Sequence, residues 1–241
     1  MNLRFCVIVT IFLNTVFTSS IIAAPIKSGD QHYNNVGFFD IHVCNWPNRP
    51  LFFMNLFSTP QFRQVQEIYI YSPENKLVSK MPLDKFRIIA KKGKPEKRVF
   101  INQVDINKDF SNGWYTAEIK MIDGSTHRAK DYVIIDEVAI VNEINPQDGA
   151  EAILIPKRLQ WTPAQGAAYY QIFIRDLWND GKLILKSKLL DKPYLDIPQG
   201  LLEADRWYSW VIHARDSREH VLLGDFNHGS LSAEYKFTTA P

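Results

Sequence analysis

Short runs in which apolar and polar residues alternate recur along the chain after residue 24, and they limit the folds that it can adopt. Each run is bounded by Gly, Pro, Asn or Asp, which favour turns. No window of ten residues in this part of the chain keeps the 3.6-residue period of an amphipathic helix. The sequence therefore predicts an all-β protein whose paired sheets bury alternate residues of each strand between them.

The clearest hairpin is the segment 113–135. We expect Asp123 and Gly124 to form a two-residue turn, because both central positions of such a turn need positive φ, which glycine and Asp tolerate best. On the strand before the turn, the side that carries Ala117, Ile119 and Met121 is expected to be buried, because these apolar residues share one parity.

A boundary between two domains is predicted in residues 141–150, "VNEINPQDGA", where turn-forming residues follow a run of strand-like sequence. We therefore expect a flexible N-terminal segment at 25–35, one domain at 36–141 and a second at 142–241. Each domain has the length of a seven-stranded sandwich. The first resembles an immunoglobulin-like sandwich by its strand rhythm.

Four segments of the second half carry a more specific pattern. Two tryptophans and a tyrosine lie within "DRWYSWVIHARD", 205–216, and alternation places Tyr208 and Trp210 on the same face as Ile212 and Ala214. Tyr208 also follows Leu202 by six residues. The other matching segments are "PKRLQWTP" at 156–163, "GAAYYQIFIRD" at 166–176 and "AEYKFTT" at 233–239.

Together these segments resemble a fibronectin type III domain. The resemblance implies a core that contains Leu159, Trp161, Tyr170, Ile172, Ile174, Tyr208 and Trp210. It also implies a corner in which the Tyr208 hydroxyl bonds back to the chain. The family has a proline two residues after the leucine of this corner, and Ala204 stands there instead.

The first 24 residues predict a secretory signal that is cleaved. Arg4 precedes an apolar run from Phe5 to Phe17, and small residues lead to an exit near Ala23 or Ala24. The alternative is an N-terminal membrane anchor, but the apolar run is shorter than the ~20 residues that a spanning helix needs. We therefore expect a secreted or periplasmic monomer without a stable membrane anchor.

Charge and cysteine content narrow the possible partners. Cys44 is the only cysteine after residue 24, so the exported chain would form no internal disulfide. The formal charge of +2 falls to +1 once Arg4 leaves, which predicts no binding to nucleic acid. The basic run "KKGKPEKR", 91–98, is interrupted by Gly93, Pro95 and Glu96 and reads as a solvated hairpin tip, with a polyanion site as the alternative.

A search for catalytic and metal-binding patterns predicts no catalytic residue, metal site or cofactor. The nucleophile-elbow, metalloprotease, phosphate-loop and dinucleotide-binding motifs are absent. His213 and His220 could bind a metal, but their separation of seven residues is not a typical ligand spacing. His42 and Cys44 could form a nucleophilic pair, although a plain buried cysteine is the preferred interpretation.

Surface recognition is the remaining function. Trp178 beside a predicted turn, Trp46 in "CNWPNRP" and Trp207, which has the opposite parity to Tyr208, are the candidate contacts. The alternative for Trp178 is that it folds back over the edge of its own domain. The sequence favours an exported, non-enzymatic protein that binds a protein or carbohydrate partner. A periplasmic assembly or chaperone-like accessory and an unrecognised enzyme are the alternatives.

Overall fold

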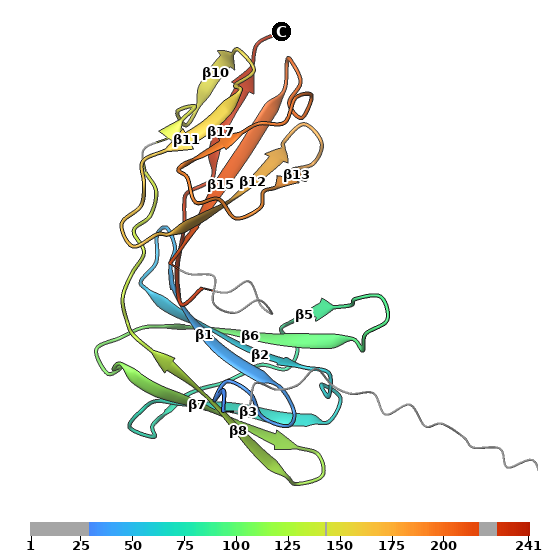
Figure 1. The fold of residues 1–241 in the computed structure, drawn as a ribbon, viewed down its shortest axis with the longest axis vertical. Coiled ribbons are helices and arrows are strands. Elements are labelled where there is room, and N and C mark those ends of the chain that lie inside the picture. Colours follow the sequence, from blue (N-terminus) through green and yellow to red (C-terminus); the bar gives the residue numbers. More distant parts are fainter. Residues whose placement is uncertain (1–28, 143, 217–225) are drawn as a thin grey trace, which may run out of the picture. The chain divides into compact units, whose positions relative to one another are not determined.

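The computed structural model describes residues 29–142, 144–216 and 226–241, and the regular structure in these residues is β-strand (Figure 1). By its internal contacts the chain divides into Met1–Asp30 and Gln31–Pro241, and the strands lie in the second unit. The predicted signal at 1–24 lies outside the described residues. Among the described residues, no helix is long and apolar enough to cross a membrane.

Eight strands form the first sandwich. One sheet has the order β1-β2-β6-β5 and the other the order β4-β3-β7-β8, with antiparallel pairing throughout. This is the strand order of an immunoglobulin-like fold, whose first, second, fifth and fourth strands share a sheet. The strands are β1 (Phe38–Asn45), β2 (Phe52–Thr59), β3 (Val65–Tyr71), β4 (Leu77–Lys80), β5 (Phe86–Ile89), β6 (Lys97–Asp105), β7 (Gly113–Met121) and β8 (Thr126–Val133).

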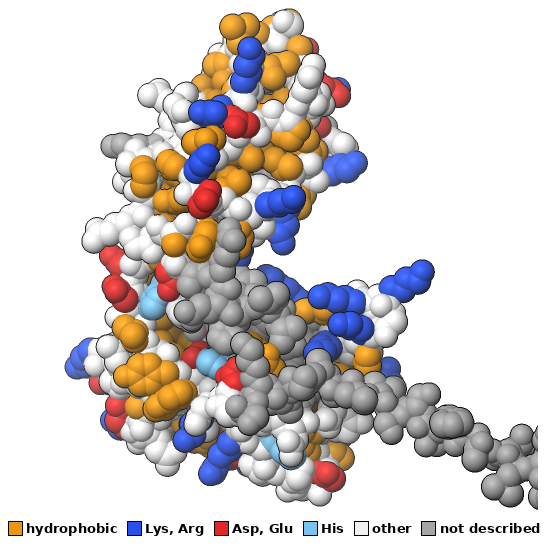
Figure 2. All heavy atoms as spheres, in the orientation of Figure 1, with side chains coloured by type: hydrophobic (Ala, Val, Ile, Leu, Met, Phe, Trp, Pro, Cys, Tyr) orange, Lys and Arg blue, Asp and Glu red, His pale blue; other side chains and the backbone are white. Residues whose placement is uncertain are grey.

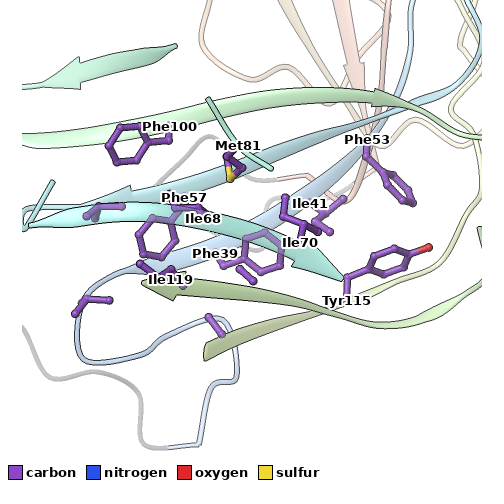
Figure 3. Packing of buried hydrophobic residues seen from close by; sticks show 14 of the residues in the cluster. Phe39, Ile41, Phe53, Phe57, Ile68, Ile70, Met81, Phe100, Tyr115 and Ile119 are labelled. Atoms are coloured by element: carbon purple, nitrogen blue, oxygen red, sulfur yellow. The ribbon is translucent and has the colours of Figure 1, made fainter. Parts of the chain in front are cut away.

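The core of the first sandwich lies between these two sheets (Figure 3). Phe39 and Phe57 from one sheet meet Ile68 and Ile119 from the other, and all four side chains are buried. The Tyr115 hydroxyl donates a hydrogen bond to the Ser111 carbonyl at 2.9 Å. A tyrosine near the start of this strand that bonds back a few residues is a hallmark of immunoglobulin-like domains, and this role of Tyr115 was not predicted from the sequence.

The hairpin between β7 and β8 differs from its prediction. Lys120 pairs with Thr126, and the Gly124 amide donates to the Met121 carbonyl at 3.0 Å. Gly124 has φ of 84°, whereas Asp123 is not in the positive region. The prediction of a two-residue turn was wrong, because Asp123 instead uses its side chain to accept the Ser125 amide at 2.8 Å. The predicted strand parity is confirmed, since Ala117, Ile119 and Met121 are all buried.

Nine strands form the second sandwich. One sheet has the order β14-β11-β9, and in the other β15 pairs with β12, β16 and β17, while β13 extends β12 and β10 extends β17. This is a fibronectin type III-like sandwich with its closing strand divided into β16 and β17. The strands are β9 (Ile144–Asn145), β10 (Ala150–Ile153), β11 (Arg158–Trp161), β12 (Tyr169–Asp176), β13 (Lys182–Lys186), β14 (Tyr194–Asp196), β15 (Trp207–Arg215), β16 (His228–Leu231) and β17 (Tyr235–Thr239).

The core of the second sandwich contains the residues that the alternation placed there. Trp161, Tyr208 and Trp210 are buried, together with the inward-facing residues of β12. The Tyr208 hydroxyl accepts a hydrogen bond from the Glu203 amide at 2.8 Å, which confirms the predicted corner. The corner forms although Ala204 replaces the proline of the family.

The two cores divide earlier than residue 141. Ile135 packs against the first core, whereas Val138 and Val141 belong to the second. Both valines were expected at the end of the first domain, but β8 ends at Val133 and the described residues 134–142 contain no strand. The change from one core to the other therefore comes between Ile135 and Val138.

Part of the segment 25–35, expected to be flexible, is attached to the first sandwich. The His32 carbonyl accepts the Phe39 amide at 2.9 Å, and the Gln31 carbonyl accepts the Lys130 amide at 2.8 Å. Val36 follows directly in the core. These bonds fix residues 31–35 to β1 and β8, while 25–28 lie outside the described residues.

Strand β1 is hydrogen-bonded along both edges. It pairs with β2 on one side and, over Val43 to Asn45, with β16 in parallel on the other. On that second side, the Val43 amide donates to the Asn227 carbonyl at 2.8 Å, and the Ile41 amide donates to the Asp131 carboxylate at 2.7 Å. One strand thus contributes to both sandwiches.

His228 on β16 is hydrogen-bonded through both of its ring nitrogens. Its Nδ1 lies 2.7 Å from an Asp216 carboxylate oxygen and its Nε2 lies 2.7 Å from the Ile134 carbonyl, an arrangement that suits a ring protonated on both nitrogens. Burial alone would lower the pKa of His228, but these partners outweigh it and the pKa is raised. Burial would raise the pKa of Asp216, but the hydrogen bond from His228 outweighs it and the pKa is lowered.

These opposite shifts predict a pH window for stability. The His228–Asp216 pair contributes fully to the free energy of unfolding between the unfolded pKa values of Asp and His, about pH 4 to 6.5. It is lost as the pH rises through the raised pKa of His228, because the native state then gives up a proton that it holds more tightly. We expect urea unfolding at pH 5.5 and 8.5 to show a loss of about 0.5–1 kcal/mol, after allowance for solvent screening.

The His228→Gln variant should lack this part of the pH dependence. His127→Gln is the matched control, because His127 lies on β8 and its ring is hydrogen-bonded to the Ser125 hydroxyl at 3.2 Å. An unchanged pH profile in His228→Gln would contradict the assignment.

Candidate functional site

Two exposed tryptophans lie at one end of the second sandwich. Trp178 is 61% exposed and stands between β12 and β13, while Trp207 is 42% exposed and begins β15. The Leu177 amide donates to the Trp207 carbonyl at 2.9 Å, so the two segments are backbone neighbours. We call Trp178, Arg206, Trp207 and Lys236 the tryptophan end.

The turn after Trp178 explains why its side chain is exposed. Asp180 and Gly181 have φ of 51° and 68°, and the Lys182 amide donates to the Asn179 carbonyl at 2.9 Å. Two positive φ values are typical of a type I′ turn, and this turn lies within the loop 177–181 that joins the last strand pair, Asp176 and Lys182. The Trp178 amide is held by the Asp176 carboxylate at 3.0 Å. Trp178 therefore stands at the rim of a tight turn, outside the core.

Each exposed indole has a basic neighbour. The Arg206 guanidinium carbon lies 6.0 Å from the Trp178 ring centroid, and the Lys236 Nζ lies 5.8 Å from the Trp207 ring centroid. These distances are at the outer limit of cation–π attraction, so the contacts contribute little to stability. Arg206 is also paired with Glu203, at 2.9 Å between Nη2 and Oε2. Lys236 lies near Glu234 in the same way, at 3.9 Å between Nζ and Oε2, so the arrangement presents aromatic surface beside paired charges.

The outer face of the adjoining sheet continues this mixed surface. Arg175 pairs with Ser209 and Phe173 with Val211, so these residues share the face of Trp207. Phe173 and Val211 are half-buried. Figure 2 shows hydrophobic side chains on the second sandwich with Lys and Arg side chains at their margins. An extended partner could contact both the tryptophan end and this face.

The third candidate tryptophan is placed differently. Trp46 is half-buried and meets Phe52 edge-on, with 5.0 Å between ring centroids. It packs against the small cluster of Cys44, Phe52 and Phe226. The structure therefore brings Trp178 and Trp207 together and gives Trp46 a packing contact instead.

Cys44 lacks the environment of a nucleophile. Its thiol is buried and faces the His42 carbonyl, with 3.8 Å between Sγ and the oxygen. Burial raises the pKa of Cys44 to about 12, so the thiol stays protonated at neutral pH. The His42 ring instead contacts Asp40, at 2.9 Å between Nε2 and Oδ2.

A metal site formed by His213 and His220 was the alternative in the sequence analysis, and His220 lies outside the described residues. Burial, with a smaller contribution from Arg215, lowers the pKa of His213 to about 3. A neutral ring follows at physiological pH. The His213 ring meets the Phe226 ring edge-on, with 4.8 Å between the ring centroids, and this is a packing contact.

Sequence reasoning missed one group of titratable residues. His32, Asp40, His42 and Asp131 meet at the edge between β1 and β8. His32 and Asp131 are 99 positions apart. The only local signal was the alternate spacing of Asp40 and His42, which places both on one face of a strand.

No protein-family model and no curated protein matches the sequence. Among solved structures, a segment of titin is 11% identical with a TM-score of 0.25, and the match covers 80% of this chain and 60% of that chain. The FN1-FN3 domains of chicken CNTN1 are 11% identical with a TM-score of 0.29, covering 85% of this chain and 65% of that chain. In both cases the chain spans less than two thirds of the other structure. The IG1 and IG2 domains of DIP-gamma are 11% identical with a TM-score of 0.23, and the match covers 86% of this chain and 98% of that chain.

Proposed function

We propose that this protein is an exported, non-enzymatic binding protein whose second sandwich contacts a protein partner through the tryptophan end. The observation that carries the proposal is the exposure of Trp178 and Trp207, each beside a basic side chain. Tryptophan and arginine are the residue types most enriched at the energetic centres of protein interfaces. Immunoglobulin-like and fibronectin-like sandwiches commonly form cell-surface binding modules.

The charge of the tryptophan end indicates the chemistry of the partner. Arg206 and Lys236 are paired with Glu203 and Glu234, so the surface would favour a partner with an apolar centre to cover the two indoles and a polar rim of both charge signs. Each tryptophan that becomes buried removes about 150–250 Å² of side-chain surface from water. Export is supported by the signal-like residues 1–24.

Trp178→Ala and Trp207→Ala test this proposal. Each variant should weaken capture of the partner by about tenfold or more, which corresponds to ~1.4 kcal/mol and is modest for an interface hot spot. Tagged protein is incubated with extracts of its own envelope and medium, and the recovered proteins are quantified by mass spectrometry. Both variants should melt within a few degrees of the parent, since neither side chain belongs to the core.

Trp114→Ala is the matched control, because Trp114 is also an exposed tryptophan but lies on β7 of the first sandwich. It should leave capture unchanged. Equal recovery of every protein by all three variants would exclude the tryptophan end as the contact. Binding to a glycan array that is lost in the same two variants would instead assign the surface to a carbohydrate partner.

A further inference from the structure

His32, Asp40, His42 and Asp131 form a cluster that the binding function does not use. Asp40 and His42 lie on β1, Asp131 lies on β8, and His32 precedes β1. The His32 Nε2 is 3.0 Å from Asp131 Oδ1, and the His42 Nε2 is 2.9 Å from Asp40 Oδ2. One ligand atom from each of His32, Asp40 and Asp131 lies within 4.8 Å of the other two.

The two carboxylates are held in place by neighbouring donors. Asp131 Oδ2 accepts the Ile41 amide at 2.7 Å, which leaves Oδ1 facing His32. His42 is buried and its ring contacts Phe226, with 4.1 Å between centroids, so it fixes Asp40 in turn. Metal-binding carboxylates and imidazoles are typically oriented by such hydrogen-bond partners.

The charge of the cluster requires compensation. Asp40 and Asp131 are 2% and 5% exposed, and two ionised carboxylates are costly in a site with so little solvent. Two protons or one divalent cation would balance the pair.

We propose that His32, Asp40 and Asp131 bind one Zn²⁺ ion. Zn²⁺ accepts both imidazole nitrogen and carboxylate oxygen as ligands and can hold a water in its fourth position, whereas Ca²⁺ and Mg²⁺ prefer oxygen ligands in larger number. Zinc bonds of about 2.0–2.2 Å place tetrahedral ligands about 3.4 Å apart, so the cluster needs only small side-chain rotations.

The position of the cluster indicates how an ion could enter and which segments it would hold together. The His32 side chain is 18% exposed, so the ion can enter from the side of this residue. His32 belongs to residues 31–35, which reach the sandwich edge through backbone bonds to β1 and β8. A bound ion would therefore link the start of the first sandwich to both β1 and β8.

The test uses the purified protein without a histidine tag, stripped with chelator and dialysed against micromolar ZnCl₂. We expect one zinc per chain by elemental analysis and a zinc-dependent rise of the melting temperature. His32→Ala should lower zinc affinity at least tenfold and abolish the rise. Asp40→Asn should do the same while it keeps the shape of the carboxylate.

His127→Ala is the control, since His127 lies on the same strand β8 and is hydrogen-bonded to Ser125 outside the cluster. It should bind zinc as the parent does. The proposal fails if the parent retains no zinc, if His32→Ala and His127→Ala bind it equally, or if Ca²⁺ or Mg²⁺ displaces zinc at similar concentration.

Discussion

Trp210→Ala is expected to lower the free energy of unfolding by about 3–5 kcal/mol, the usual cost of emptying a large buried aromatic site. Trp210 is 1% exposed and lies 6.3 Å from Trp161 and 5.7 Å from Tyr235, measured between ring centroids. A domain of this size holds only about 5–15 kcal/mol in total. Urea unfolding followed by tryptophan fluorescence measures the loss.

Two further variants make this result specific. Trp207→Ala removes a neighbouring but exposed indole, so it should cost less than about 0.5 kcal/mol. Trp210→Phe should cost much less than Trp210→Ala, because the Trp210 Nε1 has no hydrogen-bond partner within the described residues. The phenylalanine variant thus loses volume but also removes a desolvated donor. Equal losses for Trp210→Ala and Trp207→Ala would contradict the assigned core.

Gly37→Ala is the second variant for which we expect a large loss, of about 3 kcal/mol in the first sandwich. A Cβ at Gly37 would lie 2.6 Å from the Phe57 ring and 2.6 Å from the Ser58 carbonyl oxygen. The ring belongs to the core and the carbonyl belongs to the β1–β2 pairing, so neither can move without breaking native contacts. Chemical unfolding measures the change.

Gly124→Ala provides the comparison for this overpacking. A Cβ at Gly124 meets no atom within 4 Å, but φ is 84°, so the variant carries backbone strain alone. That strain should cost only about 1–2 kcal/mol. If Gly37→Ala proved no more damaging than Gly124→Ala, the close approach of β1 and β2 at this point would be disproved.

The alternation of side chains predicted the cores well because burial between two sheets acts on every second residue. Tyr208 and Trp210 were placed correctly for this reason, and Trp207 was correctly separated from them by its parity. Turn geometry was harder to predict. Asp-Gly occurs at 123–124 and at 180–181, but only the second has both residues at positive φ, because the strand register decides how many residues a turn contains.

Features that depend on contacts between distant segments could not be predicted. Val138 and Val141 lie in a run of apolar residues that resembles a strand in sequence. In the structure they lie outside any strand and pack into the second core. The meeting of His32 with Asp131 depends on the return of β8 beside β1. Trp46 packs against a cluster that includes Phe226 from the far end of the chain, and this packing made an expected surface contact half-buried.

The two-sided bonding of β1 has a consequence for how the protein unfolds. Because β1 pairs with β2 in the first sandwich and with β16 of the second, neither sandwich can lose its strands without breaking bonds of the other. Stability is therefore shared between the two halves, which favours a single cooperative melting transition. The amides of Phe39, Ile41 and Val43, which are bonded on the side away from β2, should be among the last to exchange with deuterium.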